Sequence, residues 1–236
     1  MTYQKPLELF LNEVITMIDE NFVYDIDELV KRYPSLDMCR EDIFRAFNLL
    51  KECFLSGHKL LIAGNGGSSA DAEHIVGELM KGFKKTRGVS KDLKEKFLAL
   101  DSVKGDELAS KLQCGLPAIA LSNHQGLNTA LINDVENGGE LIFAEQLLTY
   151  GQEGDVFLAI STSGNATNIY NACLVARAKG LKIVGLTGCD GGKLKNISDV
   201  CIIAPSKETF IIQEYHLPIY HCLCLMLESY FFGDKK

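Results

Sequence analysis

The sequence has no arginine-rich stripe, and its acidic residues outnumber its basic ones. Among 236 residues, 31 Asp and Glu stand against 24 Lys and Arg, which gives a net charge of −7. This charge balance argues against a general nucleic-acid or acidic-membrane surface. It does not exclude an anionic metabolite, because a pocket can hold phosphate with backbone N–H groups alone. We therefore expect no nucleic-acid partner.

Long apolar runs and paired cysteines are also missing. No stretch approaches the roughly 18 uncharged apolar residues of a membrane helix, and Glu and Asp interrupt the N-terminal apolar residues, unlike a signal peptide. The cysteines are scattered through apolar segments without a Cys-x-x-Cys pair, which indicates buried thiols in a reducing cytosol. We expect a cytoplasmic protein without a membrane partner. The eight cysteines are Cys39, Cys53, Cys114, Cys173, Cys189, Cys201, Cys222 and Cys224.

The remaining composition is that of a soluble globular protein, with 47% hydrophobic and 23% charged residues. The length predicts one large domain, alone or with a helical appendage. Apolar residues at helical spacing predict an amphipathic helix over residues 5–20 and another over 38–56. We interpret residues 1–36 as an N-terminal helical segment and 37–236 as the main domain.

Short apolar runs alternate with helical patterns through the main domain. The runs are too short for helices and are mostly bounded by Gly, Asp, Ser or Asn, so they predict five strands. Strands that are apolar throughout indicate a parallel sheet covered on both faces, hence a doubly wound α/β fold with ligand crevices at the carboxyl ends of the strands. The expected strands are 59–63, 118–121, 156–160, 183–186 and 200–203, and the helices are 68–83, 139–150, 165–179 and 207–232.

Residues 84–116 form an insertion rich in Lys, Asp and Glu. Leu93, Phe97 and Leu100 share one helical spacing, and Leu108 and Leu112 share another, so each set predicts one side of a short helix. The segment is either a solvated insertion or a lid or subunit contact. We favour the solvated insertion.

Two expected strands end in loops suited to an anion. The first gives way to Gly64-Asn65-Gly66-Gly67-Ser68-Ser69 and the third to Ser161-Thr162-Ser163-Gly164-Asn165, each just before a helix. Unpaired N–H groups at a helix start favour phosphate. The first loop alone is equally an ordinary tight turn with a serine cap, and it matches no nucleotide fingerprint. The pair together predicts a phosphorylated small molecule as ligand.

Four further residues form a possible metal-ligand set. His74 and Glu78 lie four residues apart and share a helix face. A lone His–Glu pair at this spacing is usually a surface contact and not a metal site. Gln213 and His221 lie eight apart, about 80° around an ideal helix, although Pro218 between them can kink the axis. Two nitrogens and two oxygens suit a tetrahedral zinc, with Gln a less usual ligand.

Taken together, four stretches resemble the phosphoheptose isomerases of the sugar isomerase (SIS) family. They are AGNGGSSADAEHIVGELM, ISTSGNATN, LTGCDGG and QEYHLPIYH, and the resemblance runs through most of residues 40–232. It implies a SIS fold of flavodoxin-like type and a homotetramer with sites between subunits. It also implies conversion of sedoheptulose 7-phosphate to D-glycero-D-manno-heptose 7-phosphate, for heptose-containing surface polysaccharide precursors.

The resemblance also implies roles for individual residues. One zinc ion per subunit is expected on His74, Glu78, Gln213 and His221, with Glu78 and His221 as the catalytic acid–base pair. A phosphorylated sugar is the expected partner. The implied substrate contacts are Asn65, Gly66, Gly67, Ser68, Glu78, Asn133, Asp134, Ser161, Thr162, Ser163 and Gln213.

Two other functions stay open at this point. One is a non-catalytic SIS-fold protein, either a phosphosugar-binding protein or a regulator of replication initiation. Regulatory relatives of that kind lose the glutamate and the final histidine, whereas this chain keeps Glu78 and His221. The other is an isomerase of a different phosphosugar. Departures from the family pattern bear on that choice, and they are Val135, Ala166, Phe210-Ile211-Ile212 and Lys81-Gly82-Phe83.

Overall fold

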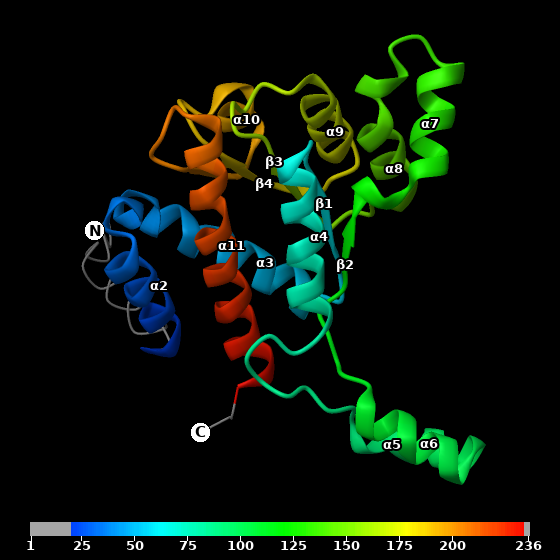
Figure 1. Cartoon of the computed structure of the whole chain (residues 1–236). Helices are drawn as coiled ribbons and strands as arrows, with labels where there is room; N and C mark the ends of the chain where they lie inside the picture. Colours follow the sequence, from blue (N-terminus) through cyan, green and yellow to red (C-terminus); the bar gives the residue numbers. More distant parts are fainter. Residues whose placement is uncertain (1–19, 234–236) are drawn as a thin grey trace, which may run out of the picture.

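The computed structural model describes residues 20–233 and is built on a parallel five-stranded sheet (Figure 1). The strand order is β2-β1-β3-β4-β5, with every neighbouring pair parallel. The predicted doubly wound sheet is confirmed, and its order reverses between β1 and β3, where such folds hold their ligands. The strands are β1 (Leu60–Ala63), β2 (Ala118–Ala120), β3 (Val156–Ile160), β4 (Lys182–Thr187) and β5 (Val200–Ile203).

Helices cover both faces of the sheet because alternate strand residues point to opposite sides. Leu60 and Ile62 pack into one core and Leu61 and Ala63 into the other. The first core is covered by α2 (Glu20–Arg32), α3 (Arg40–Leu55), α4 (Gly67–Met80) and α11 (Thr209–Phe232). The second is covered by α8 (Ile142–Tyr150), α9 (Thr167–Ala178) and α10 (Gly192–Ile197).

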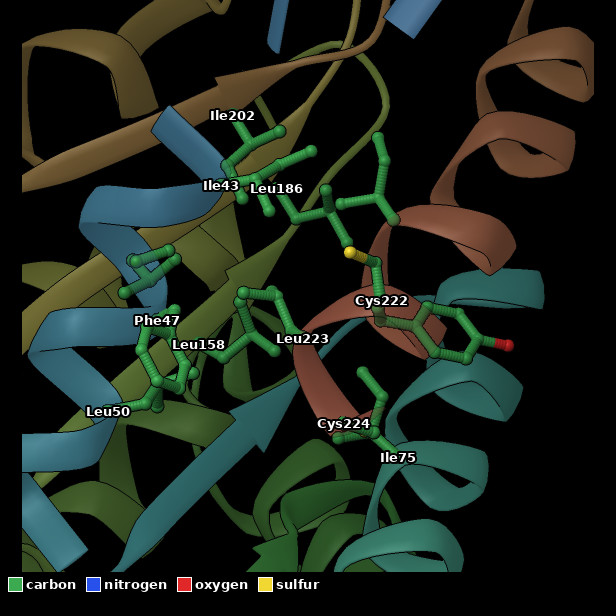
Figure 2. Close-up of a cluster of buried hydrophobic side chains, with 14 of the residues drawn as sticks. Ile43, Phe47, Leu50, Ile75, Leu158, Leu186, Ile202, Cys222, Leu223 and Cys224 are labelled. Atoms are coloured by element: carbon green, nitrogen blue, oxygen red, sulfur yellow. The ribbon is translucent and has the colours of Figure 1, made fainter. Parts of the chain in front are cut away.

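The first core seats α11 between α3, α4 and the strands (Figure 2). Cys222, Leu223 and Cys224 of α11 are buried there, and Ile75 of α4 lies beside Cys224 in the close-up. The predicted burial is confirmed for these two cysteines and is wrong for Cys189, which is exposed in the loop after β4. All eight cysteines of the chain are free thiols.

The N-terminal expectations have different outcomes. The helix expected at 5–20 lies outside the described residues. The helix expected at 38–56 is present as α3, preceded by a 3-10 turn over Pro34–Cys39. α2 lies within the segment 1–36 interpreted as helical, although no helix was expected at those residues. The sequence analysis missed α7 (Gln125–Asp134) and α10. No helix within residues 20–233 is long and apolar enough to cross a membrane.

The insertion forms a helical hairpin of α5 (Lys91–Leu100) and α6 (Ser102–Lys111). The two short helices expected there are confirmed. The hydroxyl of Ser90 accepts the Leu93 N–H, and the carboxylate of Asp101 accepts two N–H groups at the start of α6, so both helices have side-chain caps. An isolated bridge between Gly88 and Gln113 closes the base. Figure 1 shows the hairpin projecting away from the sheet, so it forms no lid over α4 and α11 of its own chain.

A buried ion pair joins the end of α4 to α11. The guanidinium of Arg87 lies 2.9 Å from the Glu228 carboxylate, and both side chains are almost fully buried. Arg87 also donates to the backbone carbonyls of Leu79 and Glu78, at 2.7 and 3.3 Å. These are carbonyls that the end of a helix leaves without an intrahelical partner. Arg87 therefore caps α4 while Glu228 holds it against α11.

The Glu228 carboxylate is stabilised as an anion. Burial alone would raise its pKa, but the N–H groups of Lys84 and Phe83 and the Arg87 guanidinium together lower that pKa below its ordinary value. Because the folded pKa is depressed, the carboxylate stabilises the fold above its unfolded-state pKa. That contribution is lost as the pH falls through the folded pKa.

We expect Glu228→Gln to lower the free energy of unfolding by about 3 kcal/mol at pH 7, because it leaves the buried Arg87 charge uncompensated. Urea denaturation followed by circular dichroism measures the change. Asp92→Asn is the control, since the Asp92–Lys96 pair is exposed on the hairpin and its loss should leave the unfolding midpoint unchanged. Equal effects of the two variants would show that Glu228 is not a structural clamp.

Candidate active site

The two predicted anion loops follow the adjacent strands β1 and β3 and lie side by side. The side-chain amides of Asn65, in the first loop, and Asn168, in the first turn of α9, exchange hydrogen bonds of 2.9 and 2.8 Å. A side chain at Gly64 would place its Cβ 2.4 Å from the Ser68 carbonyl oxygen, so the turn requires glycine there. The sheet therefore joins both loops into one polar surface at its carboxyl edge.

Several backbone donors of this surface are unused within the chain. In the part of the chain that the structure describes, the N–H groups of Gly66, Gly67 and Ser163 have no intrachain hydrogen-bond partner. The first two lie at the start of α4, where the positive end of the helix dipole also favours an anion. The arrangement can hold a phosphate group without any cationic side chain.

The loop after β3 is held by its neighbour after β4. The Gly188 N–H donates to the Thr162 carbonyl at 2.9 Å, and the Leu194 N–H donates to the Gly164 carbonyl at 3.1 Å. Gly164 has φ +66°, and a Cβ there would lie 2.0 Å from the Gly191 carbonyl oxygen. Only glycine fits this position. These contacts fix the loop that carries Ser161, Thr162 and Ser163 before any ligand arrives.

Three of the four predicted metal ligands come together between α4 and α11. The Nε2 atom of His74 lies 3.2 Å from Oε1 of Glu78, one helical turn further along α4. The ring of His221, from α11, packs edge-on against the His74 ring with centroids 5.0 Å apart. Residues separated by about 150 positions in the sequence thus face one another, as the resemblance implied.

Gln213 lies further towards the start of α11. A Cβ at Gly67 would be 2.7 Å from the Gln213 Nε2 atom, so the amide covers the first residue of α4. It therefore lies next to the phosphate-type loop, and His221 lies two turns further along, beside His74. The two helices run in the same direction (Figure 1), so their candidate site residues follow one another in the same order.

The residues present fit a metal ion by their unused atoms. Oε2 of Glu78 and Nε2 of His221 are buried and have no hydrogen-bond partner, and buried polar atoms without partners are unusual in folded proteins. Within residues 20–233, no three His, Cys, Asp or Glu side chains are spaced as a ready-made metal cluster. His74 and Glu78 instead contact each other directly, so a cation would have to replace that contact.

The side chains around the cluster are desolvated. Burial, with the nearby His74 next in importance, lowers the pKa of His221, while Glu78 acts in the opposite direction. Burial also raises the pKa of Asp71 and of Tyr220, so the Tyr220 hydroxyl stays protonated at neutral pH. The lowered pKa keeps His221 neutral at neutral pH, and the neutral imidazole is the form that binds metals or accepts a proton.

Asn133 and Asp134 are not part of this cluster within one chain. Both are exposed at the end of α7, and the amide of Asn133 donates to the Asp134 carboxylate at 2.8 Å. Figure 1 shows α7 well apart from α11.

Sequence reasoning missed two polar neighbours of the cluster. Asp71 lies three residues before His74 on α4, and this spacing could have placed it on the same helix face. The Tyr220 hydroxyl lies 2.9 Å from His74 Nδ1. No spacing rule identifies Tyr220, because it stands next to His221 in the sequence and its position depends on how α11 packs against α4.

Comparison with known proteins identifies the family of this chain. A SIS domain matches residues 105–188. A phosphoheptose isomerase of Aneurinibacillus thermoaerophilus is 41% identical over 184 residues, which cover 78% of this chain and 79% of that protein. Solved phosphoheptose isomerases of Neisseria gonorrhoeae and Francisella tularensis superpose with TM-scores of 0.65 and 0.66, at 28% and 29% identity. The alignments cover 93% of this chain and 99% and 98% of theirs.

The fold and the two loops define a SIS-domain protein of the sugar-phosphate type. Within that class, the chain belongs to the phosphoheptose isomerase family, whose members are aldose–ketose isomerases. The resemblance stated from the four sequence stretches is confirmed.

His216 lies on α11 but outside the cluster, and its Nε2 donates to the Thr187 carbonyl at 3.0 Å. This contact and its complete burial indicate a structural role for His216. Burial lowers the pKa of His216 to about 4, against an ordinary value of 6.5. The unfolded chain therefore takes up this proton before the folded chain does.

Because the folded pKa is depressed, we expect His216 to cost the fold stability as the pH falls from 6.5 to about 4. The slope is about 1.4 kcal/mol per pH unit within that window. Urea unfolding in the presence of EDTA, from pH 7 to pH 4, measures it. His216→Gln should give a flatter profile than the wild type, and parallel profiles would contradict the assignment.

Proposed function

We propose that the protein is an isomerase that converts sedoheptulose 7-phosphate to D-glycero-D-manno-heptose 7-phosphate. The observation that carries the proposal is the contact of α4 with α11. It brings the imidazole of His221, on α11, against His74, which lies one turn before Glu78 on the helix that begins at the Gly66-Gly67 loop. Curated and solved relatives named phosphoheptose isomerase support this substrate.

The reaction requires a base at carbon and a proton carrier at oxygen. An aldose–ketose isomerisation moves a proton between C1 and C2 through an enediol, while hydrogen shifts between the two oxygens. We assign the carbon base to Glu78 and the oxygen-side proton transfer to His221. Both groups lie in the α4–α11 contact, so they can face one bound sugar.

The two oxygens of Glu78 have different surroundings, which bears on its double assignment as base and ligand. Oε1 contacts His74, whereas Oε2 is buried and unpaired. Because a metal ion needs only one of these oxygens, the other can accept the substrate proton. This division removes the conflict between a carboxylate fully engaged as ligand and a free base.

We assign one zinc ion per subunit to His74, Glu78, Gln213 and His221. When bound, zinc supplies Lewis-acid stabilisation of the charge that develops on the substrate oxygens. The buried, unpaired atoms of Glu78 and His221 support this assignment. The mixed nitrogen and oxygen donors are also ones that zinc accepts.

The loops after β1 and β3 position the other end of the substrate. The free N–H groups of Gly66, Gly67 and Ser163 would hold the distal phosphate, and the hydroxyl of Thr162 lies in the same loop. Anchoring the phosphate fixes the reacting carbons relative to Glu78, which removes much of the entropic cost of the reaction.

We further propose a homotetramer with sites between subunits, in the cytoplasm. Phe210 and Leu217 of α11 and Ile132 of α7 are exposed apolar side chains in the single chain, with 61%, 41% and 59% of their surface accessible. Subunit contact would cover them and could bring Asn133 and Asp134 to a neighbouring site. The free state of all eight cysteines agrees with a reducing compartment.

The function is tested by assaying sedoheptulose 7-phosphate turnover in zinc-loaded, chelator-treated and zinc-restored protein, with metal content measured in each. We expect turnover to disappear on metal removal and to return with zinc. Full turnover by metal-free protein would remove zinc from the proposal. Turnover of other C5–C6 ketose phosphates alone would reassign the substrate, and no turnover of any of them would favour a phosphosugar-binding protein.

Glu78→Gln should lower kcat by about 10²- to 10⁴-fold, because the amide cannot accept the substrate proton. Phosphosugar binding and the oligomeric state should persist. Glu73→Gln is the matched control, since Glu73 lies on the same helix and contacts only the Ser122 hydroxyl among the described residues, at 3.3 Å. It should behave as wild type, and turnover retained by Glu78→Gln would exclude Glu78 as the base.

A further inference from the structure

Behind His74, a buried tyrosine connects the two site helices. Its hydroxyl, from Tyr220 of α11, lies 2.9 Å from His74 Nδ1 and donates to Oδ1 of Asp71 at 3.3 Å. Only 1% of the Tyr220 surface is accessible, and its ring packs edge-on against His74. A phenylalanine would fill the same space, so the hydroxyl itself requires an explanation.

The donors and acceptors along this chain of contacts place a proton on Nδ1 of His74. A tyrosine hydroxyl carries one hydrogen, and an ionised carboxylate only accepts. With that hydrogen donated to Asp71, the Tyr220 oxygen can only accept from His74, so Nδ1 of His74 carries its proton. Nε2 of His74 then faces Glu78, 3.2 Å away. It donates to the carboxylate when it carries a proton, and it offers its lone pair to a cation when that proton has left.

This geometry is that of an outer-shell contact to a metal-binding histidine. Such histidines usually give their second ring N–H to a neighbouring acceptor, which fixes both the tautomer and the orientation of the ring. Here the acceptor is a hydroxyl from the opposite helix. The contact therefore also ties the ring of His74, on α4, to the helix that carries His221.

We propose that Tyr220 is a positioning residue that, oriented by Asp71, holds His74 with Nε2 directed at Glu78 and at a bound divalent cation. The inference deepens the proposed function and rests on it. Asp71 orients the hydroxyl, and Tyr220 supplies the acceptor for His74 Nδ1. Of these three residues, only His74 would contact the cation.

The test is zinc affinity, measured with zinc alone by competition against a chromophoric chelator. Removing an outer-shell contact costs about 10- to 100-fold in metal affinity, and we expect Tyr220→Phe to raise the zinc Kd by at least tenfold. Tyr215→Phe is the matched control. It removes a hydroxyl from the same helix that contacts Ser35 at 3.0 Å, and it should leave the Kd unchanged.

A double-mutant cycle with His74→Ala tests whether Tyr220 acts through His74. If it does, adding Tyr220→Phe to His74→Ala should change the Kd by less than twofold, because the group that it orients is gone. A further tenfold loss would overturn the inference, as would a wild-type Kd in Tyr220→Phe itself. Thermal unfolding of each variant without metal identifies a general loss of folding.

The outcomes separate this inference from the proposed function. Wild-type protein that binds zinc and turns over sedoheptulose 7-phosphate, while Tyr220→Phe keeps the wild-type Kd, overturns only the role of Tyr220. Wild-type protein that binds no zinc overturns that role together with the zinc assignment, whatever the turnover assay shows.

Discussion

The parallel packing of α4 against α11 is the constraint on which the rest of the site depends. Three contacts at successive levels hold it: Gln213 over Gly67 at the start, His221 against His74 in the middle, and Glu228 with Arg87 at the end. The Glu228 carboxylate also accepts the backbone N–H groups of Phe83 and Lys84, which follow α4. A shift of either helix would therefore leave a buried charge without its partner. The side chains proposed as catalytic lie along this helix contact, next to core residues of the same helices such as Ile75 and Cys224.

Much of the fold was predictable because its causes are local. Strands buried on both faces are apolar throughout, as in β3, and their alternation with helices indicates a parallel sheet. The elements that were missed have weaker patterns. α7 contains no buried residue, so its apolar positions do not mark an inner face, and α10 is only six residues long. In α2 the many charged residues obscure the helical spacing of the apolar positions Ile26 and Leu29, which are buried.

The candidate site was predictable in part, because two of its properties depend only on short segments of sequence. A glycine-rich turn at a strand end exposes N–H groups, and the i,i+4 spacing places His74 and Glu78 on one helix face. That His221 meets them depends on packing across about 150 residues, and it followed from family resemblance rather than from spacing. The Tyr220 contact and the Arg87–Glu228 pair depend on tertiary structure alone.

The most direct measurement of the central claim is a crystal structure of the zinc-loaded protein with sedoheptulose 7-phosphate, with anomalous data at the zinc edge. The account predicts an anomalous peak about 2.0–2.2 Å from ring nitrogens of His74 and His221 and from an oxygen of Glu78. It also predicts the substrate phosphate at the N–H groups of Gly66 and Ser163. A zinc peak away from the α4–α11 contact, or a phosphate bound elsewhere, would contradict it.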